Sequence, residues 1–275
     1  MLVELLKVIF LGIIEGITEW LPISSTGHML LVDEFLKLSA SDEFKELFFI
    51  VIQLGAILAV VLIYGSRLNP FARRTKGRGF YLRGDTVALW VKIVVACVPG
   101  AVVTLLFDDW IDAHLHTPIV IAAALIVYGV AFLLIEGKRR RAPRVRRVRD
   151  LALSDALLIG LFQVLAIIPG TSRSGATIIG ALLIGVSRVA AAEFTFFLAV
   201  PVMFGYSLLK LFKFGLSFTI SEAFLLLVGM VTAFLVSVAI IRFLMRYIRH
   251  HNFRIFGWYR IVLGVIVLVF FTLVR

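Results

Sequence analysis

Six long apolar runs dominate this 275-residue chain. Each run, at about 18 to 23 residues, is long enough to cross the hydrocarbon core of a bilayer as a helix. Because lipid-exposed backbone must satisfy its own hydrogen bonds, runs of this length favour helices over the short strands of a membrane barrel. The runs lie at residues 46–64, 89–107, 117–136, 190–212, 222–243 and 257–274. With 61% hydrophobic residues, the chain is predicted to be an all-α polytopic membrane protein with six transmembrane helices.

Positive charge is concentrated in a few segments beside the apolar runs. Residues 66–84 are rich in arginine, and residues 138–149 read KRRRAPRVRRVR. Further arginines flank the fifth and sixth runs: Arg242, Arg246, Arg249 and Arg254. The net charge of +11 therefore fits the positive-inside pattern of cytoplasmic loops, and nucleic acid is not an expected partner. An acidic turn at 108–117 and a nearly uncharged segment at 213–221 are expected on the opposite side.

Two further apolar stretches, 2–37 and 151–187, must each begin and end on one side of the membrane for the six spans to alternate. Both are predicted to be re-entrant helical hairpins. The residues Pro22, Ser25 and Glu46 recur, at one constant offset, as Pro169, Ser172 and Glu193. Since the two hairpins precede spans that run in opposite directions, the chain is predicted to contain an inverted repeat.

The predicted organisation is a single membrane domain built from two repeats. The first repeat covers residues 1–137, a basic cytoplasmic linker covers 138–150, and the second repeat covers 151–275. Both termini are then expected on the external side. Folds of this kind place their working site near the bilayer midplane, where broken helices of the two repeats meet.

The first hairpin carries polar residues where an apolar helix centre is expected, in EGITEWLPISSTGH, residues 15–28. Glu15 and Glu19 are four residues apart and share one helix face, with side chains roughly 5 to 6 Å apart. Two carboxylates this close in a low dielectric can share a proton, pair with a cation such as an arginine, or bind a divalent metal ion. Oxygen ligands favour Mg²⁺ or Ca²⁺.

Pro22 is expected to end the first helix of this hairpin, and a second half-helix is expected to begin near Gly27. The residues between them are candidate caps: Ser24, Ser25 and Thr26. His28 follows Ser25 by about one turn, so the two are candidates for a nucleophile and its proton carrier. The alternative is that His28 has only a structural role and forms a hydrogen bond with a neighbouring helix.

The second hairpin repeats the device in PGTSRSGAT, residues 169–177. Proline and glycine stop a helix, and Thr171 or Ser172 can cap the next one. Arg173 adds a cation. Two helix N-termini, several hydroxyls and an arginine fork are typical of a site for phosphate or diphosphate. The two glutamates fit such a site if a divalent ion bridges them to the anion.

The two motifs resemble the signatures of the bacterial undecaprenyl-diphosphatase family of the bacitracin-resistance type (UppP/BacA). A third stretch, VIQLGAILAVV at 51–61, also matches. The resemblance implies an enzyme of the bacterial cytoplasmic membrane that hydrolyses undecaprenyl diphosphate, a lipid carrier of peptidoglycan synthesis, with Mg²⁺ or Ca²⁺. The family positions matched here are Glu15, Glu19, Ser24, Ser25, His28, Ser172, Arg173, Ser174 and Thr177.

The roles follow from combining the residue chemistry with this resemblance. Catalysis is assigned to Glu19, Ser25, His28 and Arg173, with Ser25 and His28 both open as the attacking group. Diphosphate binding is assigned to Ser24, Thr26, Ser172, Ser174 and Thr177, and metal binding to Glu15 and Glu19. The lipid substrate and the membrane are the expected partners, and a homodimer is a hypothesis. The reactive groups cluster in the first hairpin, which predicts a site open to the periplasmic or outer face.

Two other functions fit parts of the pattern. A lipid-phosphate transporter or flippase would share the inverted repeat and the anion site, alone or combined with hydrolysis. The excess of proton-handling groups, Glu15, Glu19 and His28, favours an enzyme. The other membrane lipid-phosphatase superfamily is disfavoured because SRSGAT lacks the second histidine of that signature.

Overall fold

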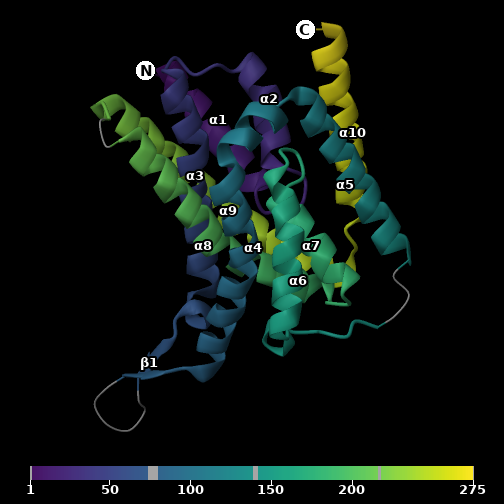
Figure 1. Ribbon diagram of the computed structural model, residues 1–275. Coiled ribbons are helices and arrows are strands. Elements are labelled where there is room, and N and C mark those ends of the chain that lie inside the picture. The colour runs from purple at the N-terminus through teal and green to yellow at the C-terminus, as the bar shows by residue number, and fades with distance from the viewer. Residues whose placement is uncertain (1, 74–79, 139–141, 216–217, 275) are drawn as a thin grey trace.

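The computed structural model describes residues 2–73, 80–138, 142–215 and 218–274, and it is almost entirely helical. The α-helices are α1 (Leu2–Thr18), α2 (Ser25–Phe35), α3 (Asp42–Leu68), α4 (Gly84–Leu115), α5 (Pro118–Lys138), α6 (Leu153–Val164), α7 (Arg173–Leu183), α8 (Arg188–Phe214), α9 (Ile220–His250) and α10 (Arg254–Val269). Shorter elements are the 3-10 turns η1 (Val148–Asp150) and η2 (Leu165–Ile167) and the π-helical end η3 (Phe270–Val274). Figure 1 shows the long helices forming a bundle around the shorter ones.

Six helical segments of the described chain are long and apolar enough to cross a membrane, as the sequence predicts. They are Glu43–Leu68, Gly84–Phe107, Pro118–Gly137, Arg188–Phe214, Ile220–His250 and Arg254–Leu273. Each contains one of the six predicted runs, or all of it except one terminal residue. Many large apolar side chains on their outer faces are exposed, as helices that face lipid require. The protein is therefore a multi-pass membrane protein.

Two details differ from the sequence prediction. The acidic segment 108–117 is not a turn, because α4 continues to Leu115 and the ring of Trp110 stacks on that of His114 with centroids 4.8 Å apart. The basic segment 66–84 contains a two-stranded antiparallel ribbon, β1 (Phe71–Arg73) and β2 (Phe80–Leu82). Its predicted basic residues Arg74, Lys76 and Arg78, and Arg139 to Arg141 of the linker, lie outside the described residues.

The first predicted hairpin turns back inside the protein. The chain between α1 and α2 breaks at residues 19–24. The ends of this hairpin lie together, because the Lys7 ammonium donates to the carbonyl of Lys37 at 2.6 Å and the Ser39 N–H donates to Glu4 at 3.0 Å. α2 has 11 residues and is shorter than a bilayer requires, and α1, with 17 residues, lies at the lower limit of that length.

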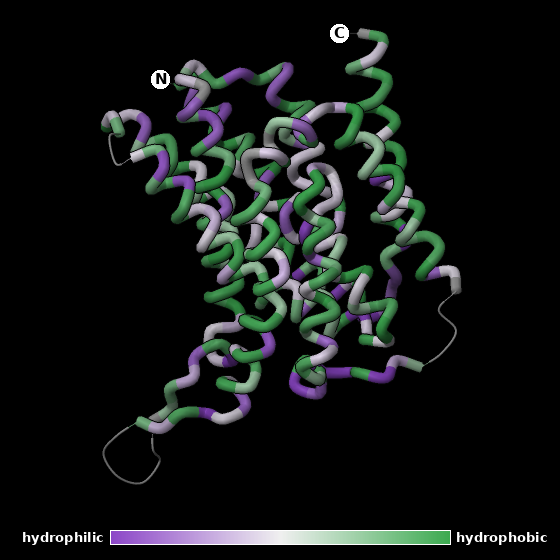
Figure 2. The backbone as a smooth tube through the Cα atoms, viewed as in Figure 1, coloured by the Kyte–Doolittle hydropathy of each residue, from purple (hydrophilic) through white to green (hydrophobic). Residues whose placement is uncertain are grey.

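The second hairpin turns back in the same way, between η2 and α7. Its ends also lie together, because Val145 bridges Val186 and the Ser187 N–H donates to the carbonyl of Val145 at 2.8 Å. In Figure 1 the N- and C-termini lie at one end of the bundle, whereas the β1–β2 ribbon lies at the other. Figure 2 shows hydrophilic residues gathered at the ribbon end and in the linker before α6. The N-terminus, where the first hairpin begins, and the linker that leads into the second therefore lie at different ends of the bundle.

Candidate functional site

The two breaks share one backbone device. α2 begins after Ser24 and α7 after Ser172, and each serine oxygen accepts the N–H three residues on, from Gly27 at 3.4 Å and Gly175 at 3.2 Å. Both serines have a left-handed backbone, with φ of 71° and 70°. Apart from glycines, they are the only residues of the described chain with positive φ. Such conformations are costly outside glycine and concentrate at functional sites.

The matching caps correct the sequence alignment by one residue. The sequence repeat pairs Ser25 with Ser172, whereas the structure makes Ser24 the counterpart of Ser172. Ser25 is instead the first residue of α2, where its hydroxyl is free of the capping role.

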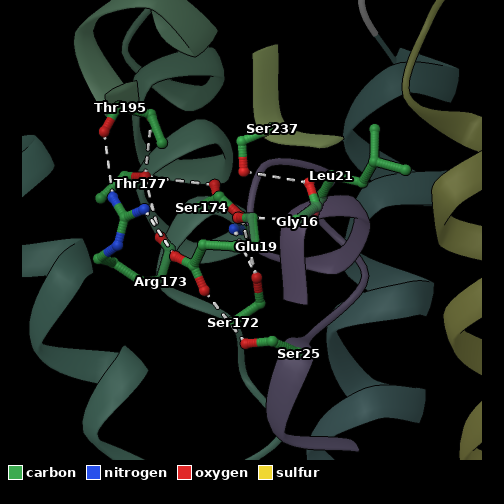
Figure 3. A network of polar contacts seen from close by, with 11 residues as sticks. Gly16, Glu19, Leu21, Ser25, Ser172, Arg173, Ser174, Thr177, Thr195 and Ser237 are labelled. Carbon is green, nitrogen blue, oxygen red and sulfur yellow. Dashed lines mark hydrogen bonds and ion pairs between the residues drawn. The ribbon is translucent and has the colours of Figure 1, made fainter. Parts of the chain in front are cut away.

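An ion pair joins the two breaks at the centre of the protein (Figure 3). The Arg173 guanidinium donates from Nη2 to Oε1 of Glu19 at 2.9 Å and from Nη1 to the carbonyl of Thr195 at 3.1 Å. Ser25 donates to the other carboxylate oxygen, Oε2 of Glu19, at 3.1 Å. Pairing with an arginine, one of the three predicted options for the glutamates, is therefore realised at Glu19.

Buried hydroxyl groups hold the breaks together behind this ion pair. The Ser174 hydroxyl lies within hydrogen-bond distance of the carbonyls of Glu19 at 3.3 Å and Leu21 at 3.4 Å, and of the Ser172 hydroxyl at 3.1 Å. Thr177 bonds the hydroxyl of Thr195 at 2.8 Å. Ser174 and Thr177 are buried, and their hydroxyls are already bonded to other protein groups. These hydrogen bonds hold the second break in place.

His28 lies on α2, one turn after Ser24. Its Nδ1 is 2.7 Å from the Ser24 carbonyl oxygen, and its Nε2 is 2.7 Å from the hydroxyl of Tyr259 on α10. In the described chain no hydrogen bond joins His28 to Ser25, whose hydroxyl faces Glu19 instead. Thr26, on the same turn, is exposed. The structure thus brings Glu19, Ser25 and Arg173 into direct contact and leaves His28 beside them with different partners.

Glu15 lies one turn before Glu19 on α1 and is only 1% exposed. Its Oε1 is buried without a hydrogen-bond partner. Within the described residues, no group of three or more His, Cys, Asp or Glu side chains is placed to hold a metal ion. An orphaned carboxylate oxygen beside a second carboxylate still fits a hard ion such as Mg²⁺, which commonly takes one or two carboxylates and completes its shell with phosphate oxygens and water.

Arg260 is a central residue that the sequence reasoning missed. This α10 side chain is fully buried. Its guanidinium donates to the carbonyls of Pro22 at 3.2 Å, Gly170 at 2.7 Å and Thr171 at 2.9 Å, so it ties the two breaks together. Its guanidinium carbon also lies 5.7 Å from the centre of the Tyr128 ring. The sequence feature that could have identified it is a lone arginine inside an apolar run, because charged residues within membrane spans are usually functional.

Comparison with known proteins gives consistent matches over nearly the whole chain. Residues 8–266 match the family described as bacitracin resistance protein BacA. A protein named undecaprenyl-diphosphatase from Enterococcus faecalis is 62% identical over 97% of both chains. Undecaprenyl-diphosphatase 1 from Clostridium acetobutylicum is 56% identical over 99% of both chains, and the undecaprenyl-diphosphatase of Lachnoclostridium phytofermentans is 58% identical over 99% of both.

Proposed function

Because this chain belongs to the bacitracin resistance protein BacA family, we propose that its joined breaks form the active site of an undecaprenyl-diphosphatase. The protein is a membrane hydrolase that cleaves the acid anhydride of undecaprenyl diphosphate, giving undecaprenyl phosphate and inorganic phosphate. This activity fits the lipid-carrier cycle of cell-wall synthesis and resistance to bacitracin. The contact of Glu19 with both Ser25 and Arg173 carries the proposal for the site.

The hydrogen bond from Ser25 to Glu19 supports Ser25 as the attacking group. As Ser25 Oγ attacks the terminal phosphorus, its proton passes to Glu19, the new O–P bond forms and the bridging P–O bond breaks. Undecaprenyl phosphate then leaves. In the second step the oxygen of water attacks the phosphorus, the P–Oγ bond breaks, Glu19 returns its proton to Ser25 Oγ, and inorganic phosphate is released. His28, one turn along α2, is proposed to take the proton of that water.

Arg173 supports the same step by charge. Its guanidinium, fixed between Glu19 and the Thr195 carbonyl, stabilises negative charge on the transferring phosphoryl group. The N-terminal ends of α2 and α7 add backbone dipoles that favour a bound anion. The half-buried Ser172 and the exposed Thr26 add hydroxyls beside those ends. A divalent ion held by Glu15 and Glu19 would neutralise further charge on the phosphoryl oxygens.

The hairpins are proposed to be re-entrant and the two halves to be an inverted repeat. Exchanged contacts support this: α1 packs on α9 whereas α6 packs on α4, and α5 packs on α10. The ion pairs between α3 and α8 are also reciprocal. Glu46 of α3 pairs with Lys210 of α8, and Glu193 of α8 pairs with Arg67 of α3. Such exchange is typical of two units related by a two-fold axis.

This arrangement supports the predicted repeats, 1–137 and 151–275, and their basic linker at 138–150. The end that carries the linker and the β1–β2 ribbon is proposed to be cytoplasmic, and both termini, at the opposite end in Figure 1, are proposed to be external. The first hairpin then opens its site to the outer face. The homodimer stays a prediction.

The orientation is testable with a cysteine at the exposed Thr26 in a Cys97→Ala background. A membrane-impermeant thiol reagent should label Thr26→Cys in intact cells. An Arg149→Cys variant at the basic end is the matched control, which should label only after lysis. The reverse pattern would place the site on the cytoplasmic side.

The activity is testable by phosphate release from a C55 prenyl diphosphate in detergent, with and without EDTA. We expect metal-dependent release by the wild type and its loss in Glu19→Gln. This variant should remain folded at the assay temperature, although it leaves Arg173 without its buried partner and should melt below the wild type. Folded wild-type protein that binds the lipid without releasing phosphate would contradict hydrolysis and favour the lipid-transport alternative.

A further inference from the structure

Tyr259 has a contact with His28 that the proposed chemistry does not use. The two residues are far apart in sequence but their rings lie nearly parallel, with centroids 5.5 Å apart and planes at 11°. The Tyr259 hydroxyl lies 2.7 Å from Nε2 of His28. Tyr259 is 45% exposed, whereas Arg260, the next residue, is buried against both breaks. The Tyr259 side chain therefore lies between the buried polar centre and the exposed face of α10.

The other hydrogen bond of His28 determines the direction of this contact. A backbone carbonyl can only accept, so Nδ1, 2.7 Å from the Ser24 oxygen, carries a proton. In the neutral ring Nε2 then holds the lone pair, and the Tyr259 hydroxyl donates to it. The one basic atom of His28 is therefore occupied by Tyr259, and it cannot accept a proton from water at the same time.

An arriving diphosphate offers the Tyr259 hydroxyl a stronger acceptor. Hydrogen bonds to ionised oxygens are roughly twice as strong as those between neutral groups. We propose that Tyr259 masks Nε2 of His28 in the substrate-free protein and turns its hydroxyl to a phosphoryl oxygen of the bound substrate, which frees His28 to act as a base. Tyr259 would then be both a positioning residue for His28 and a contact for the substrate.

The masking step is tested without substrate, so its outcome does not depend on the proposed function. Diethyl pyrocarbonate acylates unprotonated imidazole nitrogens, and mass spectrometry reports labelling at each histidine separately. We expect Tyr259→Phe, which keeps the ring but removes the hydroxyl, to label His28 several-fold faster than the wild type. The exposed His114 provides the internal reference in every sample.

A second stacked pair supplies a matched control. The ring of Tyr247 stacks on His251 with centroids 4.4 Å apart, but Nδ1 of His251 bonds the Tyr247 backbone oxygen. Tyr247→Phe leaves that bond intact, so labelling of His251 should not change. If Tyr259→Phe labels His28 at the wild-type rate while Tyr259→Leu labels it faster, ring stacking alone shields the histidine and the masking proposal is overturned.

The substrate contact rests on the proposed function and is tested by kinetics. Loss of one charge-assisted hydrogen bond to a phosphoryl oxygen should raise the KM of Tyr259→Phe roughly tenfold. The kcat should fall by a smaller factor than the rise in KM, because the His28 base itself is retained. A lowered kcat with an unchanged KM would overturn the contact. An inactive wild type would instead count against the proposed function and leave the labelling result to decide on masking.

Discussion

The two breaks share a backbone design and differ in what surrounds them. Each has a serine cap with left-handed φ, an 11-residue helix after the cap, and carbonyl oxygens bound by Arg260. After the second break, α7 is buried continuously from Ser174 to Leu182. After the first, only Gly27 and Met29 of α2 are buried.

This difference indicates a division of labour. The second break is a buried anchor that presents Arg173, whereas the first is the accessible half that carries Ser25, Thr26 and His28. Inverted-repeat proteins commonly place a shared site where such broken helices meet. Under the proposed function, one break would supply rigidity and the other the reacting groups, so equivalent substitutions in the two breaks should have unequal effects.

The largest expected contrast is between two serine hydroxyls. Ser25→Ala removes the proposed attacking group and should lower kcat by about 10⁴-fold or more, with little change in melting temperature. Ser174→Ala removes a buried hydroxyl and should lower stability by about 1 kcal/mol, with an activity loss below about tenfold. Phosphate release and thermal unfolding of both variants check this, and similar activity in the two would remove the proposed division.

Arg173 should show the next largest effect because it connects the two breaks. Arg173→Ala should lower kcat about 10²- to 10³-fold by removing charge stabilisation from the phosphoryl group. Arg173→Lys keeps the charge but cannot bond both Glu19 and the Thr195 carbonyl, so it should recover only part of the loss. Steady-state kinetics of the two variants measure this difference, and full activity of the alanine variant would contradict it.

Substitutions of the serine caps should have smaller effects, and these should appear mainly in the stability of the protein. Ser172→Ala loses the cap but keeps the strained φ, and should cost about 1 kcal/mol. Ser172→Gly also loses the side-chain oxygen but accepts φ of 70° without strain. The glycine variant should therefore melt at a higher temperature than the alanine variant. The opposite order would show that the left-handed backbone at this position is not a significant cost.

The smallest contrast concerns the reciprocal ion pairs of α3 and α8. The Glu46 side chain is 62% exposed and that of Glu193 is 11% exposed. Glu46→Gln should therefore change stability by less than about 1 kcal/mol, because solvent screens an exposed pair. Glu193→Gln should lower the melting temperature more, since it leaves Arg67 without its buried partner. Equal shifts in thermal unfolding would contradict this ranking.

Most of the fold could be predicted because a bilayer restricts the options so strongly. Apolar runs of bilayer length can only be helices or barrel strands, and all six predicted runs lie in long apolar helices. Proline, glycine and hydroxyl residues in the middle of apolar stretches marked the positions of both breaks. The contact between Glu19 and Arg173 was foreseeable only as one of three options for the glutamates.

The remainder depends on tertiary contacts that local patterns do not encode. Nothing local shows that Arg260 reaches carbonyls of both breaks, or that Tyr259 meets His28. The continuation of α4 through an acidic segment was also missed, because acidic composition was interpreted as a turn although no proline or glycine interrupts residues 108–117. The sequence alignment paired Ser25 rather than Ser24 with Ser172. Both residues are serines, so residue type could not show that the positive φ and the helix cap belong to Ser24.

The central claim is that the two breaks act as one catalytic unit. A double-mutant cycle of Glu19→Gln and Arg173→Ala, measured as kcat/KM for phosphate release from a C55 prenyl diphosphate, tests it most directly. If the ion pair joins one site, the double variant should lose little more activity than the more damaged single variant. Losses that multiply would mean that the two breaks act independently, and would contradict this account.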